Sequence, residues 1–499
     1  MEKQNSYSHI LKYTGLFGGV QGLNILVGVV RNKLVALILG PSGMGLLALF
    51  SSTIKLVGDS TNLGLSVSAI RELSSAYDDN DQHALLHRID VFRHWSLFAS
   101  MLGLLVCALL SPLLSRWTFS FGNHVLHFVL LSPVVGLTTF SAGELAILKA
   151  TRRLHDVAMS LVCLAVASLA VAVPIYYFFG NSGIVPSLVA LIVLQTFFVV
   201  RYSFRAYPFR LKFGIATFRE GLGFIKLGIA FVFAGMACSG AEMGIRAYLS
   251  YAGDVDTVGL YNAAYVMIFT YAGMIFTAME TDYYPRLSSV KSLGREFNDV
   301  VNSQIEISLH IVSPLLILFI LFMPVLLPLL YSGKFLSIVP MIQVAALSMY
   351  ARSMYVPVEY ISLSRGDSRR FFILELINAI LLISMVLLGY MHCGLLGTGI
   401  GMAVASFVEL IISVMFCRVC YGYKGISDIY RVVAVHLGLG LVTYATTFVG
   451  SLWAYCCIGF VAFCLDIAYS LTIVRKHVSL MDSIKRKFCG KLSKLKKRQ

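Results

Sequence analysis

The chain has 499 residues, of which 58% are hydrophobic and only 13% are charged, and its mean hydropathy is +0.80. This apolar share is far above that of ordinary soluble domains and excludes a soluble globular protein. The formal net charge is +15, but the basic residues follow a membrane topology and do not form a nucleic-acid-binding patch.

Apolar runs long enough to cross a hydrocarbon core of about 30 Å as helices recur along the whole chain. Helices satisfy their backbone hydrogen bonds internally, which lipid requires. We therefore predict an all-α polytopic membrane protein with about 14 transmembrane helices. The predicted spans are 12–39, 44–70, 94–119, 124–149, 155–179, 183–205, 222–250, 257–283, 303–330, 335–363, 370–390, 395–420, 430–450 and 452–474.

Lys and Arg are distributed unequally between alternate connections. Of the 40 basic residues, only Arg116 and Lys334 fall in or beside one set of loops, five fall deep inside spans, and the rest lie in or beside the connections of the opposite side. Because basic residues favour the cytoplasm, both termini are predicted to be cytoplasmic, with external loops at Gly40–Gly43 and Gly253–Asp256. The basic tail is expected to rest on anionic membrane lipids.

An internal repeat is indicated by a shift of 214 residues, which aligns Gly45 with Gly259 and brings Arg31 within one residue of Arg246. Both segments begin on the same side, as in the parallel repeats of transporters whose substrate site lies between two halves. The predicted domains are six-helix lobes at 1–212 and 213–427, two additional spans at 428–474 and a basic cytoplasmic tail at 475–499.

Five basic residues fall deep within predicted spans, away from their cytoplasmic ends, and a basic residue near a helix centre costs roughly 2.5 to 3.5 kcal/mol. They are Arg31, Lys33, Lys55, Arg246 and Arg352. One interpretation is internal neutralisation, because Lys55 and Asp59, and also Glu242 and Arg246, stand four residues apart on one helix. Lys33 can also extend to the outer interface. Arg31 has no acidic residue within its helix.

The alternative interpretation is that the basic side chains face a water-filled cavity and bind an anion. Arginine offers forked donors to phosphate, and lysine adds a mobile point charge. A diphosphate headgroup fits several such residues from both halves. The predicted diphosphate site comprises Arg31, Lys55, Arg246 and Arg352.

Three carboxylates lie deep in predicted spans, namely Asp59, Glu242 and Glu409. A deep carboxylate can exchange a proton or coordinate sodium, so these residues are candidates for H+ or Na+ coupling. Cys417 and Cys420 lack a second Cys or His pair nearby, which argues against a zinc site. No pattern predicts a cofactor or a catalytic residue.

Several segments together resemble the polysaccharide transporters of the multidrug/oligosaccharidyl-lipid/polysaccharide exporter superfamily, specifically the bacterial flippases for lipid-linked O-antigen and related units. The resemblance covers nearly the entire chain. The segments are "RNKLVALILGPSGMGLLALF", "GLYNAAYVMI", "YYPRLSSV", "LLPLLYSGKF", "IVPMIQVAAL" and "LSRGDSRRF".

This resemblance implies two six-helix bundles around a central cationic cavity, two additional helices, and alternating access in the bacterial inner membrane. It also implies the substrate, an undecaprenyl-diphosphate-linked oligosaccharide. Arg31, Lys55 and Arg246 are similar in position to basic residues of the first, second and seventh helices of related flippases, whereas Arg352 matches more loosely. Asn24 stands where flippases of the peptidoglycan precursor tend to have another arginine, which argues against that substrate.

Two other functions fit the sequence less well. Multidrug extrusion by the same fold calls for an acidic or aromatic cavity, whereas the intramembrane charges that lack a partner in the sequence are mainly basic. A membrane glycosyltransferase or polymerase needs catalytic carboxylates or a large external loop, and the sequence offers only Asp254 and Asp256 in a short turn. We therefore expect a transporter and not an enzyme.

Overall fold

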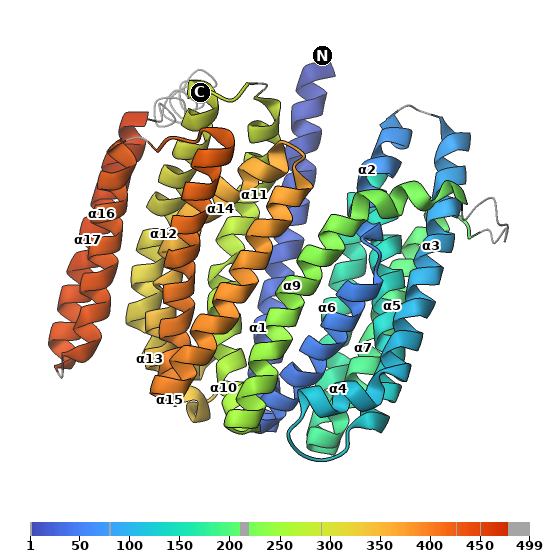
Figure 1. The fold of residues 1–499 in the computed structure, drawn as a ribbon, viewed down its shortest axis with the longest axis horizontal. Coiled ribbons are helices and arrows are strands. Elements are labelled where there is room, and N and C mark those ends of the chain that lie inside the picture. Colours follow the sequence, from blue (N-terminus) through green and yellow to red (C-terminus); the bar gives the residue numbers. More distant parts are fainter. Residues whose placement is uncertain are drawn as a thin grey trace, which may run out of the picture. The chain divides into compact units, whose positions relative to one another are not determined.

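The computed structural model describes residues 2–78, 81–209, 219–290, 292–425, 427–449 and 451–477, and the regular structure in these ranges is helical (Figure 1). Most of the predicted basic tail and the predicted lobe boundary at 212–213 lie outside the described residues. The helices in chain order are α1 (Glu2–Thr61), α2 (Leu65–Asp78), α3 (Gln82–Leu109), α4 (Ser111–Thr118), α5 (Val125–Ala150), α6 (Leu154–Phe179), η1 (Gly180–Gly183), α7 (Ile184–Ala206), α9 (Leu222–Ala252), α10 (Val255–Tyr265), η2 (Val266–Ala272), α11 (Met274–Ser289), α12 (Arg295–Leu330), η3 (Gly333–Ile338), α13 (Val339–Ala345), α14 (Ser348–Ser364), α15 (Ser368–Tyr421), α16 (Ser427–Ala445), η4 (Thr446–Phe448) and α17 (Leu452–His477).

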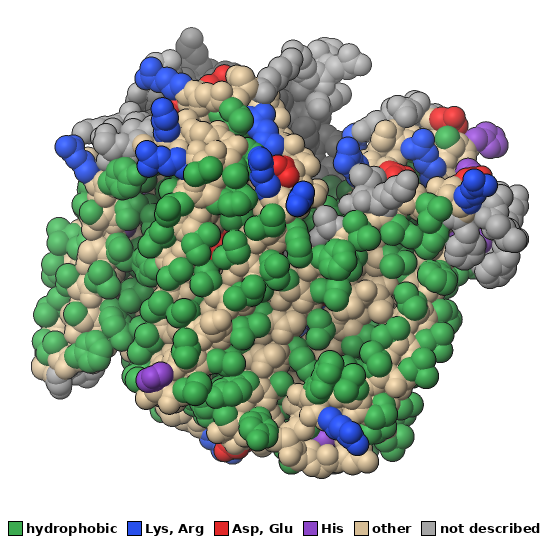
Figure 2. Space-filling view, viewed as in Figure 1, with side chains coloured by type: hydrophobic (Ala, Val, Ile, Leu, Met, Phe, Trp, Pro, Cys, Tyr) green, Lys and Arg blue, Asp and Glu red, His purple; other side chains and the backbone are tan. Residues whose placement is uncertain are grey.

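Eight segments of the described chain are long and apolar enough to cross a membrane, or nine if one bent pair, Gly333–Ala345 with Ser348–Ser364, counts as a span. Three of the eight each hold parts of two predicted spans. Leu26–Thr61 belongs to the kinked α1, Leu154–Ala206 contains α6 and α7, and Ser368–Tyr421 is the whole of the kinked α15. Hydrophobic side chains cover the helix flanks in each part of the molecule, and Lys and Arg gather at helix ends (Figure 2). The prediction of an all-α membrane protein is confirmed.

The first two predicted spans are joined by a kink and not by an open loop. The long helix α1 continues through residues 40–43 and is interrupted at Gly40, whose φ of 66° and ψ of −168° are not helical. Glycine adopts this positive φ without a steric penalty, and the following Pro41 lacks the N–H that a continuous helix would use. The kink therefore divides α1 into two helical parts without a separate connecting segment.

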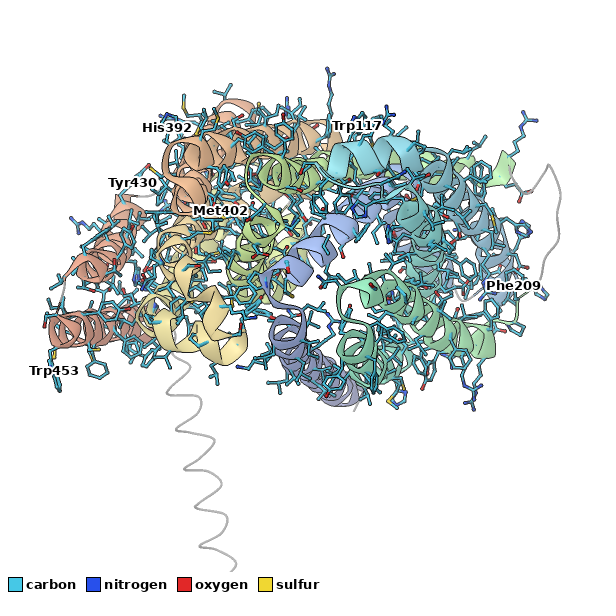
Figure 3. All side chains as sticks on the ribbon, turned by 90° about the horizontal axis from the view of Figure 1, so that it is seen from below. Trp117, Phe209, His392, Met402, Tyr430 and Trp453 are labelled. Carbon is cyan, nitrogen blue, oxygen red and sulfur yellow. The ribbon has the colours of Figure 1, made fainter. Side chains whose placement is uncertain are left out.

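The described helices form two compact units. The first comprises Met1–Val266, Val325–Val339 and Gly366–Gly401, and in it α1 packs against α6, α9 and α10. The second comprises Met267–Pro324, Pro340–Arg365 and Met402–Gln499. In the second unit α16 and α17 pack along each other, and Trp453 at the start of α17 points outward and is 82% exposed (Figure 3).

A buried ion pair joins three helices of the first unit. Arg93 of α3 donates from Nε and Nη2 to the two carboxylate oxygens of Glu144 of α5, both at 2.9 Å, and both side chains are 1% exposed. Ser203 of α7 donates to the same carboxylate, and Arg93 also donates to the Tyr207 carbonyl oxygen at 2.9 Å. This bidentate pairing holds α3, α5 and the end of α7 together. Helix α5 lines two cavities of the first unit, so the pair also helps to position their walls.

Candidate functional site

The charged centre of the first unit is a chain of three side chains on two helices. Lys55 of α1 pairs with Glu242 of α9 at 2.8 Å, from Nζ to Oε1. The other oxygen of Glu242 accepts from Nη1 of Arg246, one turn along α9, at 3.3 Å. One carboxylate therefore stands between two predicted substrate-binding cations.

This arrangement contains one of the two pairs that the sequence suggested and differs from the other. The pairing of Glu242 with Arg246 is present, as their spacing on one helix predicted. Lys55, however, forms its ion pair with Glu242 of α9. Asp59 is near enough to interact electrostatically with Lys55 but does not form the ion pair. The physical reason is that α1 and α9 pack directly against each other, which places Glu242 within reach of Lys55.

Arg246 is held by more than its carboxylate. Its guanidinium donates to the side-chain oxygen of Asn262 of α10, at 3.3 Å from Nε and 3.1 Å from Nη2, and lies 5.0 Å from the ring centre of Tyr265. The residue is only 5% exposed. Lys55, in contrast, has a side chain that is 50% exposed. Of the two cations, Lys55 is therefore the one accessible to a ligand in this conformation.

Lys55 and Asp59 face a cavity of about 390 Å³, which we call the Lys55 cavity. Its walls come from the second part of α1, the start of α2 and α5, and polar groups among them include Ser51, Asn62 and Thr138. Asp59 lies against α9, where a Cβ built on Gly235 would be 3.7 Å from the Asp59 side chain. A cavity of this size, with a few convergent polar groups, is typical of a small-ligand site.

Arg31 lies in a second cavity of the same unit, of about 380 Å³, which we call the Arg31 cavity. Helices α1, α5, α6 and α7 line it, and Ser168 and Gln195 are polar groups in its wall. Val134 of α5 belongs to the walls of both cavities. Within the part of the chain that the structure describes, Arg31 makes no hydrogen bond or ion pair. Its charge therefore faces the cavity without a protein counter-charge from those residues.

The remaining predicted residues lie in the second unit. The guanidinium of Arg352 in α14 lies over Phe269 and Phe276, at 5.6 and 5.7 Å from the ring centres. Its Nε is buried and has no hydrogen-bond partner among the described residues. Glu409 of α15 is 1% exposed and shares the hydroxyl of Ser413 with Glu359 of α14, at 3.1 and 2.9 Å.

Two further polar residues near the charged centre were not predicted. Glu375 of α15 accepts from the Cys238 thiol of α9 at 3.2 Å in the first unit. Asn262, which holds Arg246, lies 16 residues from it in sequence. The sequence signal for Asn262 is its place in "GLYNAAYVMI", where an amide side chain stands within an otherwise largely apolar predicted span.

The fold and the long apolar helices define a class, the polytopic α-helical membrane proteins. Solved structures with this fold include the lipid II flippase MurJ in an inward closed conformation, with a TM-score of 0.62 and 14% identity over 92% of this chain and 99% of that one. They also include an inward-facing multidrug resistance MATE family transporter of the MOP superfamily, with a TM-score of 0.62 and 14% identity over 82% and 95%. The MATE multidrug transporter DinF-BH aligns with a TM-score of 0.58 and 16% identity over 82% and 94%.

The family model described as "Polysaccharide biosynthesis protein" matches residues 34–340, more than half of the chain. The protein belongs to this family and has the fold of the MOP-superfamily transporters, which confirms the resemblance seen in the sequence. No curated protein sequence matches the chain.

Proposed function

We propose that the protein is a flippase that moves an undecaprenyl-diphosphate-linked oligosaccharide, an O-antigen-type or related surface polysaccharide unit, from the cytoplasmic to the periplasmic leaflet. The observation that carries this proposal is Arg31, a guanidinium facing an intramembrane cavity without a counter-charge from the described residues. A charge in this position is costly unless it serves a ligand. The match to a polysaccharide biosynthesis family supports a saccharide cargo.

In this proposal Arg31, Lys55, Arg246 and Arg352 compensate the diphosphate as it crosses. A dianion is prohibitively costly in hydrocarbon, so its passage needs cations in a wet cavity. Arg31 and Lys55 are accessible, whereas Arg246 is buried against Glu242, and this difference suggests an order in which they contact the ligand. Arg31 and the half-exposed Lys55 meet the ligand first, and Arg246 does so when Glu242 releases it.

Transport is proposed to proceed by alternating access between the lobes at 1–212 and 213–427, in the bacterial inner membrane, with both termini cytoplasmic. Asp59, Glu242 and Glu409 are proposed to couple transport to H+ or Na+. The shared hydroxyl between Glu359 and Glu409 supports a proton at that pair, because two carboxylates around one donor repel each other unless a proton or cation lies between them. Amide variants of the three carboxylates, assayed across pH and sodium concentration, test this coupling.

The experiment that tests the function is deletion of the gene in its host. The proposal predicts that a lipid-linked oligosaccharide accumulates on the cytoplasmic leaflet and that the wild-type gene clears it. Multidrug extrusion by the same fold predicts sensitivity to cationic drugs without this accumulation, and that outcome would replace the proposal.

A further inference from the structure

A continuous line of ionisable side chains runs between α12, α16 and α17 in the second unit, on helices that carry none of the residues proposed for transport. His436 of α16 contacts Asp466 of α17, with 2.6 Å between Nδ1 and Oδ1. Its other ring nitrogen, Nε2, lies 2.8 Å from Nδ1 of His310 of α12. Nε2 of His310 in turn faces Oε1 of Glu306, one turn earlier on α12, at 3.8 Å. The line therefore joins three helices through four residues.

Exposure falls steadily along this line. The side chain of Glu306 is 27% exposed, that of His310 is 3% exposed, and those of His436 and Asp466 are fully buried. The second oxygen of Asp466, Oδ2, is buried and has no hydrogen-bond partner among the described residues. A buried carboxylate with one hydrogen bond is costly as an anion, so the site gains stability from a positive charge beside it.

The hydrogen bonds determine where protons are held. The Asp466 carboxylate accepts, so Nδ1 of His436 carries a proton. The two nitrogens between His436 and His310 are 2.8 Å apart and share one proton, which either ring can hold. An additional proton therefore has one remaining ring position, Nε2 of His310, which is the nitrogen that faces Glu306.

Loading that position does not break a hydrogen bond. When Nε2 of His310 gains a proton, the shared proton can move from Nδ1 of His310 to Nε2 of His436, and the positive charge then lies beside Asp466. Both rings keep their contacts in either state. Histidine is suited to this role because it gains and loses a proton near neutral pH.

We propose that His310, His436 and Asp466 form a proton-binding site, loaded through Glu306, that fastens α16 and α17 to α12 when the proton is present. Among the described residues, the other ionisable groups around it are Tyr350 of α14, Arg431 of α16 and Tyr469 of α17. Without the proton, the site holds a buried carboxylate beside two neutral rings, and the helices are held less firmly. The site is independent of the proposed cargo, because its ligand is a proton and its elements are not those of the two cavities.

The direct test is nitrogen-15 NMR of the full-length protein, labelled at its 11 histidines, in lipid bilayers at about pH 6 and about pH 9. Exposed histidines also give imidazolium signals at the lower pH, so the variants are compared with the wild type signal by signal. The proposal predicts one imidazolium signal that is lost at the higher pH, is missing from both Asp466→Asn and His436→Gln, and is kept in His392→Gln, which removes an exposed histidine of α15. Imidazolium signals in Asp466→Asn that match those of the wild type at the lower pH would overturn the proposal.

Thermal unfolding provides a second test that does not require the signal to be assigned. The wild-type midpoint should fall as the pH rises from about 6 to about 9, because the buried carboxylate loses its counter-charge. Asp466→Asn, which keeps the shape but not the charge, should show a smaller fall than both the wild type and His392→Gln. Equal falls in all three proteins would contradict the assignment.

Discussion

Gly45 of α1 and Gly259 of α10 pack backbone against backbone, and their contact is reciprocal. A Cβ built on Gly45 would overlap the carbonyl oxygen of Val255, four residues before Gly259, and one built on Gly259 would overlap that of Pro41, four residues before Gly45. These are the two glycines that the 214-residue shift aligns. The symmetric contact supports the internal repeat, and small residues at such crossings let membrane helices approach closely.

The first prediction concerns this contact. Gly45→Ala or Gly259→Ala places a methyl group into the backbone of the other helix, so each should separate α1 from α10 and lower the thermal midpoint and transport. Gly244→Ala is the matched control, because a Cβ at that helical position meets nothing within 4 Å. If the three variants behave alike, the contact does not contribute to the fold or to transport.

A second prediction concerns Glu242. Glu242→Gln leaves the buried Arg246 without its carboxylate and should lower the free energy of unfolding by about 1–3 kcal/mol. Lys55→Gln, at a side chain that is half exposed, should cost only about 0–1 kcal/mol. Both values can be measured by chemical unfolding in the same detergent.

Variants of Glu242 and Arg246, made singly and together, distinguish a structural role of Arg246 from a role in substrate binding. Arg246→Gln and Glu242→Gln are expected to stop transport singly. The double variant should recover stability, with a coupling energy of about 0.5–3 kcal/mol, but not transport. Recovered transport in the double variant would remove Arg246 from the substrate site.

The third prediction concerns the buried pair of Arg93 and Glu144. Arg93→Ala leaves a buried carboxylate without its cation and should destabilise the first unit by about 3–5 kcal/mol. Arg201→Ala, at an exposed position of α7, should change stability by less than about 0.5 kcal/mol. Unfolding curves of the two variants that coincide would show that the pair does not hold α3 to α5.

The fourth prediction is a pH dependence at the start of α10. Asp254 is the N-cap residue and accepts from the backbone N–H and the hydroxyl of Thr257, both at 2.7 Å, and these bonds hold the pKa of its carboxyl below the usual value. Because the pKa of Asp254 is lower in the folded state than in the unfolded state, where it is about 4, the ionised carboxylate stabilises the folded state at any pH above about 4. This stabilisation is lost as the pH falls through the pKa of the folded state.

Hydrogen exchange of the first turn of α10 measures this effect. Asp254→Ala should speed exchange at neutral pH, as loss of a cap worth about 0.5–2 kcal/mol requires, and the difference from wild type should shrink in acid. Asp256→Ala, which leaves the cap intact, should have a smaller effect. A difference that does not depend on pH would show that the charge of Asp254 is not responsible.

The features that could be predicted from the sequence are those set by local pattern. The length of the apolar runs predicted a helical membrane protein, and the four-residue spacing of Glu242 and Arg246 predicted their ion pair. The partner of Lys55 could not be predicted, because it depends on how α1 packs on α9, 187 residues away. The link between His310 and His436 spans 126 residues and has no local signature. The sequence predicted a loop at residues 40–43, where the structure has a kink within α1, because Gly and Pro are also typical of loops.

Transport of a purified substrate tests the central claim most directly. The protein would be reconstituted in liposomes with a polyprenyl-diphosphate-linked oligosaccharide whose sugar reacts with an external enzyme only on the outer leaflet. Wild-type protein and Arg116→Ala, which changes an exposed arginine outside the cavities, should flip the lipid equally. Arg31→Ala should slow flipping by about 10-fold to 100-fold, as loss of a charged hydrogen bond worth about 1.5–3 kcal/mol requires, and Arg31→Lys should recover part of the rate. Wild-type flipping by Arg31→Ala, in protein that is folded and inserted, would contradict the account.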